Sequence, residues 1–471
     1  MANYLINSAG QVATGTDDAE LFLVNTGAVS ASTIYGFAGN DTLQVVDGPV
    51  ASASSFYVDL AGGADVFTAS AADFDDATII AGAGGDKIVS HNSHFDGVTK
   101  LGDGSDTVTF SAGVIAGTLA GGAGADSIIA SAVISGSASK IALGAGNDTM
   151  TFDNDAHLVS ALIVGGGGND SVTISGVANA NSLQILLDDT NNTVDGNDTL
   201  SLKITAGSAV IKGLGGNDII TIENGSQLVA SSLIQGNAGN DSIVIDDQFS
   251  ADTNVTIGGG AGQDTIVMTG SVVVAGAFTG TRVNLGGGAD SLNIDATTGG
   301  AFGTVIGGLG ADSITFSSDL ADTGFTMGQT IGFADFSDST ADGMDIVTFS
   351  NTDVTGATGG VTFNIAMVGL GSAETAGVPS LNSATIASGV ATFSSVSAVS
   401  DRISKVDALL STEGQYAVFT GSDASSVYLF VQGGTNDDIV TKFSNTIGGT
   451  ITGLSTNAGA GSSFTIEINQ A

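Results

Sequence analysis

The feature that most constrains this chain is a short unit that recurs along most of its length. The unit is a glycine-rich turn, one Asp, and a strand of alternating apolar residues, as in Gly165–Ile174 (GGGGNDSVTI). Successive Asp residues are mostly 20 to 24 residues apart, and a fixed period of that length is typical of repeat architectures. They are Asp41, Asp65, Asp86, Asp106, Asp126, Asp148, Asp170, Asp198, Asp218, Asp241, Asp264, Asp290 and Asp312, with degenerate copies at Glu20 and Asp345.

Each Asp is followed by the pattern of a strand with one buried face. The residue two positions after the Asp is apolar in every copy, and the residue four positions after it is apolar in all but one, Ser90. A period of two is the signature of a half-buried strand. A second apolar run precedes each glycine turn, as in Ser160–Val164. Each unit is therefore predicted to hold two short strands and two turns.

The length of the unit selects the fold. Roughly 22 residues are too few for two strands and a crossover helix, and the repeats show no helical periodicity. We therefore predict an all-β fold in which residues 1–350 form a right-handed parallel β-solenoid with about 22 residues per coil. The glycine turns stop near residue 350, so residues 351–471 are predicted to form a small C-terminal β-rich domain with one short helix.

The C-terminal segment has the sequence signals of one helix followed by antiparallel strands. The helix is predicted at Ser400–Leu410, capped by Ser400 or Asp401 and ended by Gly414. Antiparallel strands are predicted after it. Their ranges are Tyr416–Phe419, Val427–Gln432, Asp438–Phe443 and Ser463–Ile468.

The composition limits the kinds of partner that this chain can bind. The chain has 9 Lys and Arg against 48 Asp and Glu, a formal net charge of −39, which disfavours nucleic acid and anionic membranes and favours cations. It has no Cys, so disulfides and Cys-based metal sites are excluded, and any metal site is expected to be an oxygen site. Met1–Gly10 lacks the basic and apolar regions of an export signal, and no apolar span has membrane length. We expect neither an N-terminal signal peptide nor a transmembrane helix.

The recurring Asp suggests a cation. Calcium takes six to eight oxygen ligands, and glycine turns expose main-chain carbonyl groups. Stacked coils would place one carboxylate per coil in a column, so all the Asp residues from Asp41 to Asp312 named above are predicted to bind several calcium ions. The alternative is that they are solvated turn residues. Asp17, Asp18 and Asp103 are interpreted as surface charge.

The sequence evidence for other functional sites is weaker. His91 and His94 have the spacing His-x-x-His, but no third ligand is evident, so we expect surface histidines in a polar connector and not a zinc site. Outward Thr pairs such as Thr107 and Thr109 could form an ice-binding face, yet Ile129 interrupts the column, which favours ordinary sheet surface. Catalytic motifs are missing, and we expect no enzymatic activity.

Two copies of the unit carry a family resemblance. Gly121–Ile129 (GGAGADSII) and Gly307–Thr315 (GGLGADSIT) match every defined position of the nonapeptide G-G-x-G-x-D-x-U-x, so the chain resembles RTX proteins, whose repeats wind into a calcium-bound parallel β-roll. This implies an RTX β-roll-like solenoid. The longer period here implies calcium along one edge only. Turns that begin with Leu101, Leu143 and Leu285 instead of glycine leave a two-coil superperiod open.

The C-terminus resembles the ending of type I secreted RTX and surface-layer proteins, through Tyr416–Phe419, Tyr428–Gln432 and Asn436–Val440. The resemblance implies an uncleaved C-terminal export signal and an extracellular, cell-surface location. We expect a secreted calcium-dependent structural protein that self-assembles as a homo-oligomer into a bacterial surface layer or filament, with a cell-surface polysaccharide as a candidate anchor. The alternative is a calcium-stiffened adhesin or carrier with a binding C-terminal end. A secreted hydrolase would need a site hidden beyond about residue 350.

Overall fold

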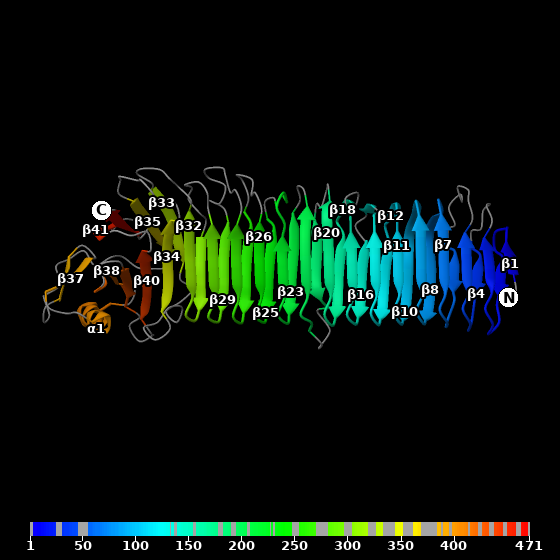
Figure 1. Cartoon of the computed structure of the whole chain (residues 1–471), viewed down its shortest axis with the longest axis horizontal. Coiled ribbons are helices and arrows are strands. Elements are labelled where there is room, and N and C mark those ends of the chain that lie inside the picture. The colour runs from blue at the N-terminus through cyan, green and yellow to red at the C-terminus, as the bar shows by residue number, and fades with distance from the viewer. Residues whose placement is uncertain are drawn as a thin grey trace. The chain divides into compact units, whose positions relative to one another are not determined.

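The structure is a computed structural model of the whole chain (Figure 1). It describes residues 3–24, 31–45, 55–131, 133–135, 139–153, 157–177, 182–189, 195–204, 208–226, 228, 231–246, 254–269, 281–295, 304–318, 326–332, 344–351, 361–368, 384–387, 390–394, 398–412, 415–422, 426–432, 438–445, 450–457 and 463–469. The chain divides into two compact units, unit 1 (Met1–Leu228) and unit 2 (Val229–Ala471). Each unit is described by itself.

Unit 1 is a parallel β-solenoid. Apart from three short connector strands, consecutive strands fall alternately into two parallel sheets, so that the chain winds in coils (Figure 1). Sheet A holds β1 (Asn3–Ile6), β3 (Leu21–Val24) after Glu20, and the strands that follow the Asp positions: β5 (Thr42–Val45), β7 (Val66–Ser70), β9 (Lys87–His91), β11 (Thr107–Phe110), β14 (Ser127–Ala130), β17 (Thr149–Phe152), β20 (Ser171–Val177), β22 (Thr199–Ile204) and β24 (Ile219–Ile222). The predicted fold class is confirmed.

Sheet B holds the strands that lead into the glycine turns. In unit 1 these are β2 (Val12–Thr14), β4 (Thr33–Tyr35), β6 (Tyr57–Asp59), β8 (Asp73–Ala83), β10 (Ser93–Asp103), β13 (Thr118–Ala123), β16 (Lys140–Ala145), β19 (Leu162–Gly167), β21 (Leu183–Asp188) and β23 (Ala209–Gly215). Where the structure describes the connecting residues, glycine turns join these strands to the acidic residue and then to sheet A. The same edge of every coil therefore carries the turn and the carboxylate.

Several connectors also form strands, which differs from the prediction of two strands per coil. The first residues of β8 pair with those of β10, which pair in turn with β12 (Gly113–Ile115). Next, β12 pairs with β15 (Val133–Ser135), which pairs with β18 (His157–Val159). The reason is an apolar residue in each connector that points into the coil: Phe74, Phe95 and Ile115 are 2%, 5% and 2% exposed. Burying these side chains holds the connectors in the extended conformation.

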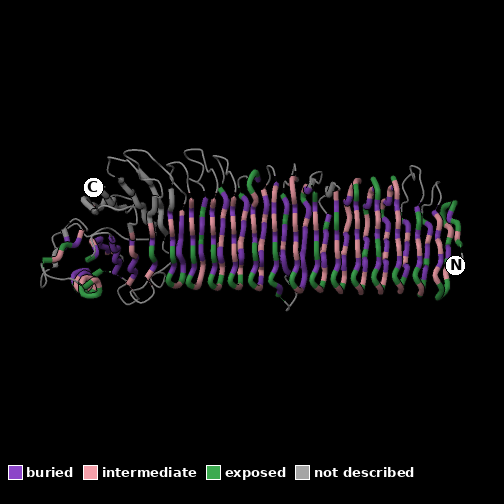
Figure 2. Tube along the Cα trace, in the orientation of Figure 1, coloured by how far each residue is buried: buried purple, intermediate pink, exposed green. Residues whose placement is uncertain are grey.

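The core lies between the two sheets. The apolar residues two and four positions after each Asp are buried, and their neighbours along the strand face outward (Figure 2). In β11, for example, Val108 and Phe110 are buried while Thr107 and Thr109 are half-buried. Phe95 and Phe110 stack edge to face with ring centroids 5.1 Å apart. This alternation confirms the period-two pattern.

Unit 2 begins with the same architecture. Its sheet A contains β26 (Ser242–Asp246), β28 (Thr265–Thr269), β30 (Ser291–Asp295), β32 (Ser313–Ser318) and β34 (Asp345–Asn351), all parallel. Its sheet B contains β25 (Leu233–Ala238), β27 (Thr256–Ala261), β29 (Arg282–Gly287), β31 (Thr304–Leu309), β33 (Thr326–Gly332) and β35 (Val361–Val368), also parallel. The solenoid pattern thus continues to the region where the glycine turns stop.

The pairing becomes antiparallel at the C-terminal end, as predicted. Here β38 (Tyr416–Thr420), β39 (Ser426–Val431) and β40 (Ile439–Asn445) form one antiparallel set, and β40 also pairs in parallel with β34. A second set joins β35 to β42 (Ser463–Asn469) and β42 to β41 (Thr450–Asn457). The C-terminal strands thereby cover the last coil of the solenoid in unit 2.

The predicted helix is α1 (Val399–Leu409). Its Val406 and Leu409 pack in an apolar cluster with strands of the antiparallel set. The predicted N-cap was wrong, because Ala398 occupies that position without a side-chain hydrogen bond and the residues expected to cap lie inside the helix. Gly414 lies outside the described residues. Within the described part of the chain, no helix has the length and apolarity needed to span a bilayer.

Candidate metal centre

Every predicted ligand occupies the same place in its coil, directly before a strand of sheet A. All of them are almost completely buried, with relative exposures of 2% or less, whereas Asp17, Asp18 and Asp103 are exposed. Within unit 1 the column comprises Asp41, Asp65, Asp86, Asp106, Asp126, Asp148, Asp170, Asp198 and Asp218. Within unit 2 it comprises Asp241, Asp264, Asp290 and Asp312. Solvated turn residues would not be buried in this way.

One oxygen of each carboxylate serves the fold itself. Oδ1 of Asp126 accepts a hydrogen bond of 2.8 Å from the main-chain N–H of Asp106, and Oδ1 of Asp148 accepts one of 2.7 Å from Asp126. The same bond recurs between successive coils from Glu20 to Asp218 in unit 1, at 2.6 to 2.9 Å. In unit 2 it recurs from Asp241 to Asp345, at 2.8 to 3.0 Å. We call this series the carboxylate ladder.

The ladder explains two features of the sequence. Glu20 and Asp345 belong to it although their motifs are degenerate, because each keeps the main-chain or side-chain group that the bond requires. It also requires a carboxylate or amide at every coil even in the absence of metal, since a buried N–H without an acceptor is costly. The sequence pattern predicted metal ligands, with solvated turn residues as the alternative, and gave no signal of this structural use.

The second oxygen of the carboxylates, Oδ2, is in a different environment. Oδ2 is buried and has no hydrogen-bond partner in Asp41, Asp65, Asp86, Asp106, Asp126, Asp148, Asp170, Asp198, Asp264, Asp290 and Asp312. Burying an ionised carboxylate oxygen without a partner is expensive, so such groups in proteins bind a cation or take up a proton. The donor set therefore fits a cation that prefers oxygen.

Glycine makes room beside this oxygen in some coils. A methyl group added to Gly121 would lie 2.6 Å from Oδ2 of Asp126 and 2.0 Å from the main-chain carbonyl oxygen of Leu143, one coil further on. We call this space, bounded by a carboxylate oxygen and the carbonyl oxygen of the next coil, a glycine cradle. Equivalent pairs flank Gly15 (Glu20 and Gly36), Gly36 (Asp41 and Leu60), Gly165 (Asp170 and Leu187) and Gly259 (Asp264 and Leu285).

Other coils have a side chain at the position of the cradle glycine, five residues before the Asp. Leu101 stands before Asp106 and Leu143 before Asp148, and both leucines are fully buried. Leu60, Ala81 and Leu285 hold the same position before Asp65, Asp86 and Asp290. Gly121, Leu143 and Gly165 alternate over three consecutive coils, whereas Ala81 and Leu101 are neighbours. The column is therefore not uniform, and the two-coil alternation is local.

Burial raises the pKa values of the carboxyl groups in the column. Loss of hydration raises the pKa of Asp170 and of Asp198 to about 8, although the hydrogen bond from the preceding coil lowers it and neighbouring carboxylates raise it further. The same causes raise the pKa of Asp65 and Asp290 to about 7, and that of Asp41, Asp86 and Asp126 to about 6. The fold thus disfavours the anionic form, and a bound cation would supply the missing positive charge.

A second ladder fixes the turns. Oδ1 of Asn169 accepts a hydrogen bond of 2.8 Å from the N–H of Asn197, and Oδ1 of Asn147 accepts one of 2.9 Å from the N–H of Asn169. The Asn precedes the Asp directly, and its bond runs in the opposite direction along unit 1. The frequent Asn-Asp spelling is therefore structural, because the two side chains tie each turn to the coils on both sides.

Comparisons with known proteins give one match. No family model and no curated protein matches the sequence. Among solved structures, the chain is similar to a hyperactive, Ca²⁺-dependent, beta-helical antifreeze protein from an Antarctic bacterium. The two share 17% sequence identity over 74% of this chain and 82% of that chain, with a TM-score of 0.41.

Proposed function

We propose that this chain is a secreted, calcium-dependent structural protein, the subunit of a bacterial surface layer or extracellular filament. The observation that carries the proposal is the buried column of carboxylates, in which the Oδ2 oxygens of the eleven Asp residues named above have no hydrogen-bond partner. A cation would stabilise the ionised form of such a column, and the roughly millimolar calcium outside cells suits modest-affinity oxygen sites of this kind. Inside the cell the scarcity of calcium would leave the chain loosely folded and exportable.

The glycine cradles are the positions at which we place calcium. Asp126 would contribute Oδ2 and Leu143 its carbonyl oxygen, and the turn that contains Gly121 would hold the ion. Calcium accepts both kinds of oxygen. Bound there, it offsets the charge that burial penalises in the ladder, and metal binding becomes part of the free energy of folding.

The outer face of sheet A supports assembly. The positions one and three after each Asp face outward, and in a chain of net charge −39 almost none of them is charged. In unit 1 they are Thr42, Gln44, Val66, Thr68, Lys87, Val89, Thr107, Thr109, Ser127, Ile129, Thr149, Thr151, Ser171, Thr173, Thr199, Ser201, Ile219 and Thr221. Copies that repel elsewhere could approach through this face, which we call the neutral face.

Assembly is tested by electron microscopy and size-exclusion chromatography of the purified chain in millimolar calcium and in excess chelator. We expect arrays or filaments with calcium and dispersal after chelation. Thr109→Glu combined with Thr151→Glu should prevent assembly without reducing calcium binding, because it places charge on the neutral face. Thr118→Glu on sheet B is the matched control and should assemble. A lasting monomer in calcium would contradict the structural subunit and favour the adhesin or carrier.

A further inference from the structure

We propose a second metal site, separate from the carboxylate ladder, formed by Asp73, Asp75 and His94 on the outer face of sheet B in unit 1. The site would bind a transition-metal ion of the Zn²⁺ type. The potential ligand atoms of these three side chains all lie within 4.8 Å of one another. This proposal shares no residue with the ladder and does not depend on calcium as the ladder's ion.

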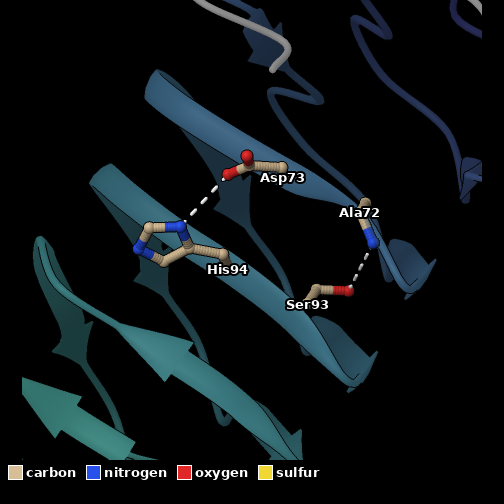
Figure 3. A network of polar contacts seen from close by, with 4 residues as sticks. All are labelled: Ala72, Asp73, Ser93 and His94. Atoms are coloured by element: carbon tan, nitrogen blue, oxygen red, sulfur yellow. Dashed lines mark hydrogen bonds and ion pairs between the residues drawn. The ribbon is translucent and has the colours of Figure 1, made fainter. Parts of the chain in front are cut away.

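The histidine faces the first carboxylate directly. His94 Nδ1 lies 3.1 Å from Asp73 Oδ1 (Figure 3). The two side chains are 39% and 42% exposed, so water molecules can complete the coordination of an ion. Beside this pair, Ser93 Oγ accepts a hydrogen bond of 3.2 Å from the N–H of Ala72 (Figure 3). That bond ties together the same two coils that provide the ligands.

The strands hold the ligands in place. Residues of β8 and β10 are paired in parallel register, with His94 opposite Asp73 and Asp96 opposite Asp75. The intervening Phe74 and Phe95 point into the core, where their rings are tilted by 35° with centroids 4.8 Å apart. Because side chains alternate along a strand, the ligands share the outer face. Asp96 is exposed next to them and adds a carboxylate to the same patch.

The chemistry of the donors selects the metal. An imidazole nitrogen with two carboxylates suits Zn²⁺ and similar ions, whereas calcium prefers oxygen ligands only. An ordinary ion pair between neighbouring coils would need one carboxylate. The presence of Asp75 within reach of the same imidazole is what distinguishes a three-ligand site from a pair.

The test uses the full chain saturated with calcium and titrated with Zn²⁺, followed by calorimetry and by NMR of the imidazoles. The chain has only three histidines, so each can be assigned with single variants. We expect about one zinc ion to bind and to shift the His94 resonances, leaving those of His91 and His157 unchanged. His94→Ala and Asp75→Asn should each weaken binding at least about tenfold, and further calcium should not displace the zinc.

His91→Ala is the matched control, because His91 lies three residues earlier at the end of β9 and should bind zinc like the parent protein. Asp75→Asn also distinguishes a three-ligand metal site from a simple ion pair, since it leaves the contact between His94 and Asp73 intact. Far-ultraviolet circular dichroism in calcium verifies that each variant is folded. Zinc binding that is unchanged in both site variants, absent from the parent protein, or abolished by calcium would overturn the proposal.

Discussion

Replacing Gly121 by Ala is expected to remove one calcium ion and to destabilise unit 1. The added methyl group would lie 2.0 Å from the carbonyl oxygen of Leu143 and 2.6 Å from Oδ2 of Asp126, so it fills the cradle and forces the backbone to shift. Overpacking of this kind typically costs about 1–3 kcal/mol, and the lost ion adds to it in calcium. Ion counting and urea unfolding measure the two effects.

Gly62→Ala is the control for this substitution. Neither Gly62 nor Gly121 has a positive φ angle. Both variants therefore test whether there is space for a methyl group, and not whether the backbone conformation requires glycine. The nearest atom to a methyl group at Gly62 is the carbonyl oxygen of Ala83 at 3.7 Å, an ordinary contact. We expect Gly62→Ala to keep the calcium count and the unfolding midpoint. If Gly121→Ala behaves in the same way, the cradle is not a metal site.

Substitutions of Asp126 should separate the two uses of its carboxylate. Asp126→Asn keeps an oxygen that can accept the N–H of Asp106, but it removes the negative charge. Asp126→Ala removes both. In calcium we expect both variants to lose one ion, and Asp126→Ala to lose a further amount of about 1–3 kcal/mol because a buried N–H is left without an acceptor.

In excess chelator the two variants should differ in stability, with Asp126→Asn the more stable. Burial raises the pKa of Asp126 to about 6, so near pH 8 the metal-free parent protein carries a buried charge that its unfolded state does not bury. Asp126→Asn removes this penalty and should be at least as stable as the parent protein. Asp126→Ala removes the same penalty but leaves the N–H of Asp106 without an acceptor, so it should be less stable than Asp126→Asn. The exposed substitution Asp103→Asn should leave stability unchanged. Equal stability of the two Asp126 variants would refute the separate roles.

The repeat itself could be predicted from the sequence. Its period selected the parallel solenoid, its alternation selected the buried positions, and the recurrent Asp located the column, because these depend on spacing along one chain. The carboxylate ladder could not be predicted, since it depends on which oxygen of Asp148 meets the N–H of Asp126 one coil away. The contact between His94 and Asp73 was missed for the same reason, as the two residues are 21 positions apart.

The glycine cradle shows which part of the site could not be predicted from the sequence. The sequence contained both Gly121 and Leu143 at equivalent positions, and their alternation was recognised as a pattern without a cause. Only the paired coils show that the carbonyl oxygen of Leu143 faces the space left by the missing side chain of Gly121. The short connector strands had a signal in hindsight, the buried aromatic residues Phe74 and Phe95, which lie outside the glycine repeat.

The most direct test of the account is a calcium titration of the metal-stripped chain, with bound ions counted by native mass spectrometry and strand content followed by circular dichroism. The buried, unpartnered Oδ2 oxygens predict that several calcium ions bind and that the strand signal and resistance to urea rise together with them. A chain that binds no calcium, or that has the same strand signal and unfolding midpoint in excess chelator as in calcium, would contradict the account.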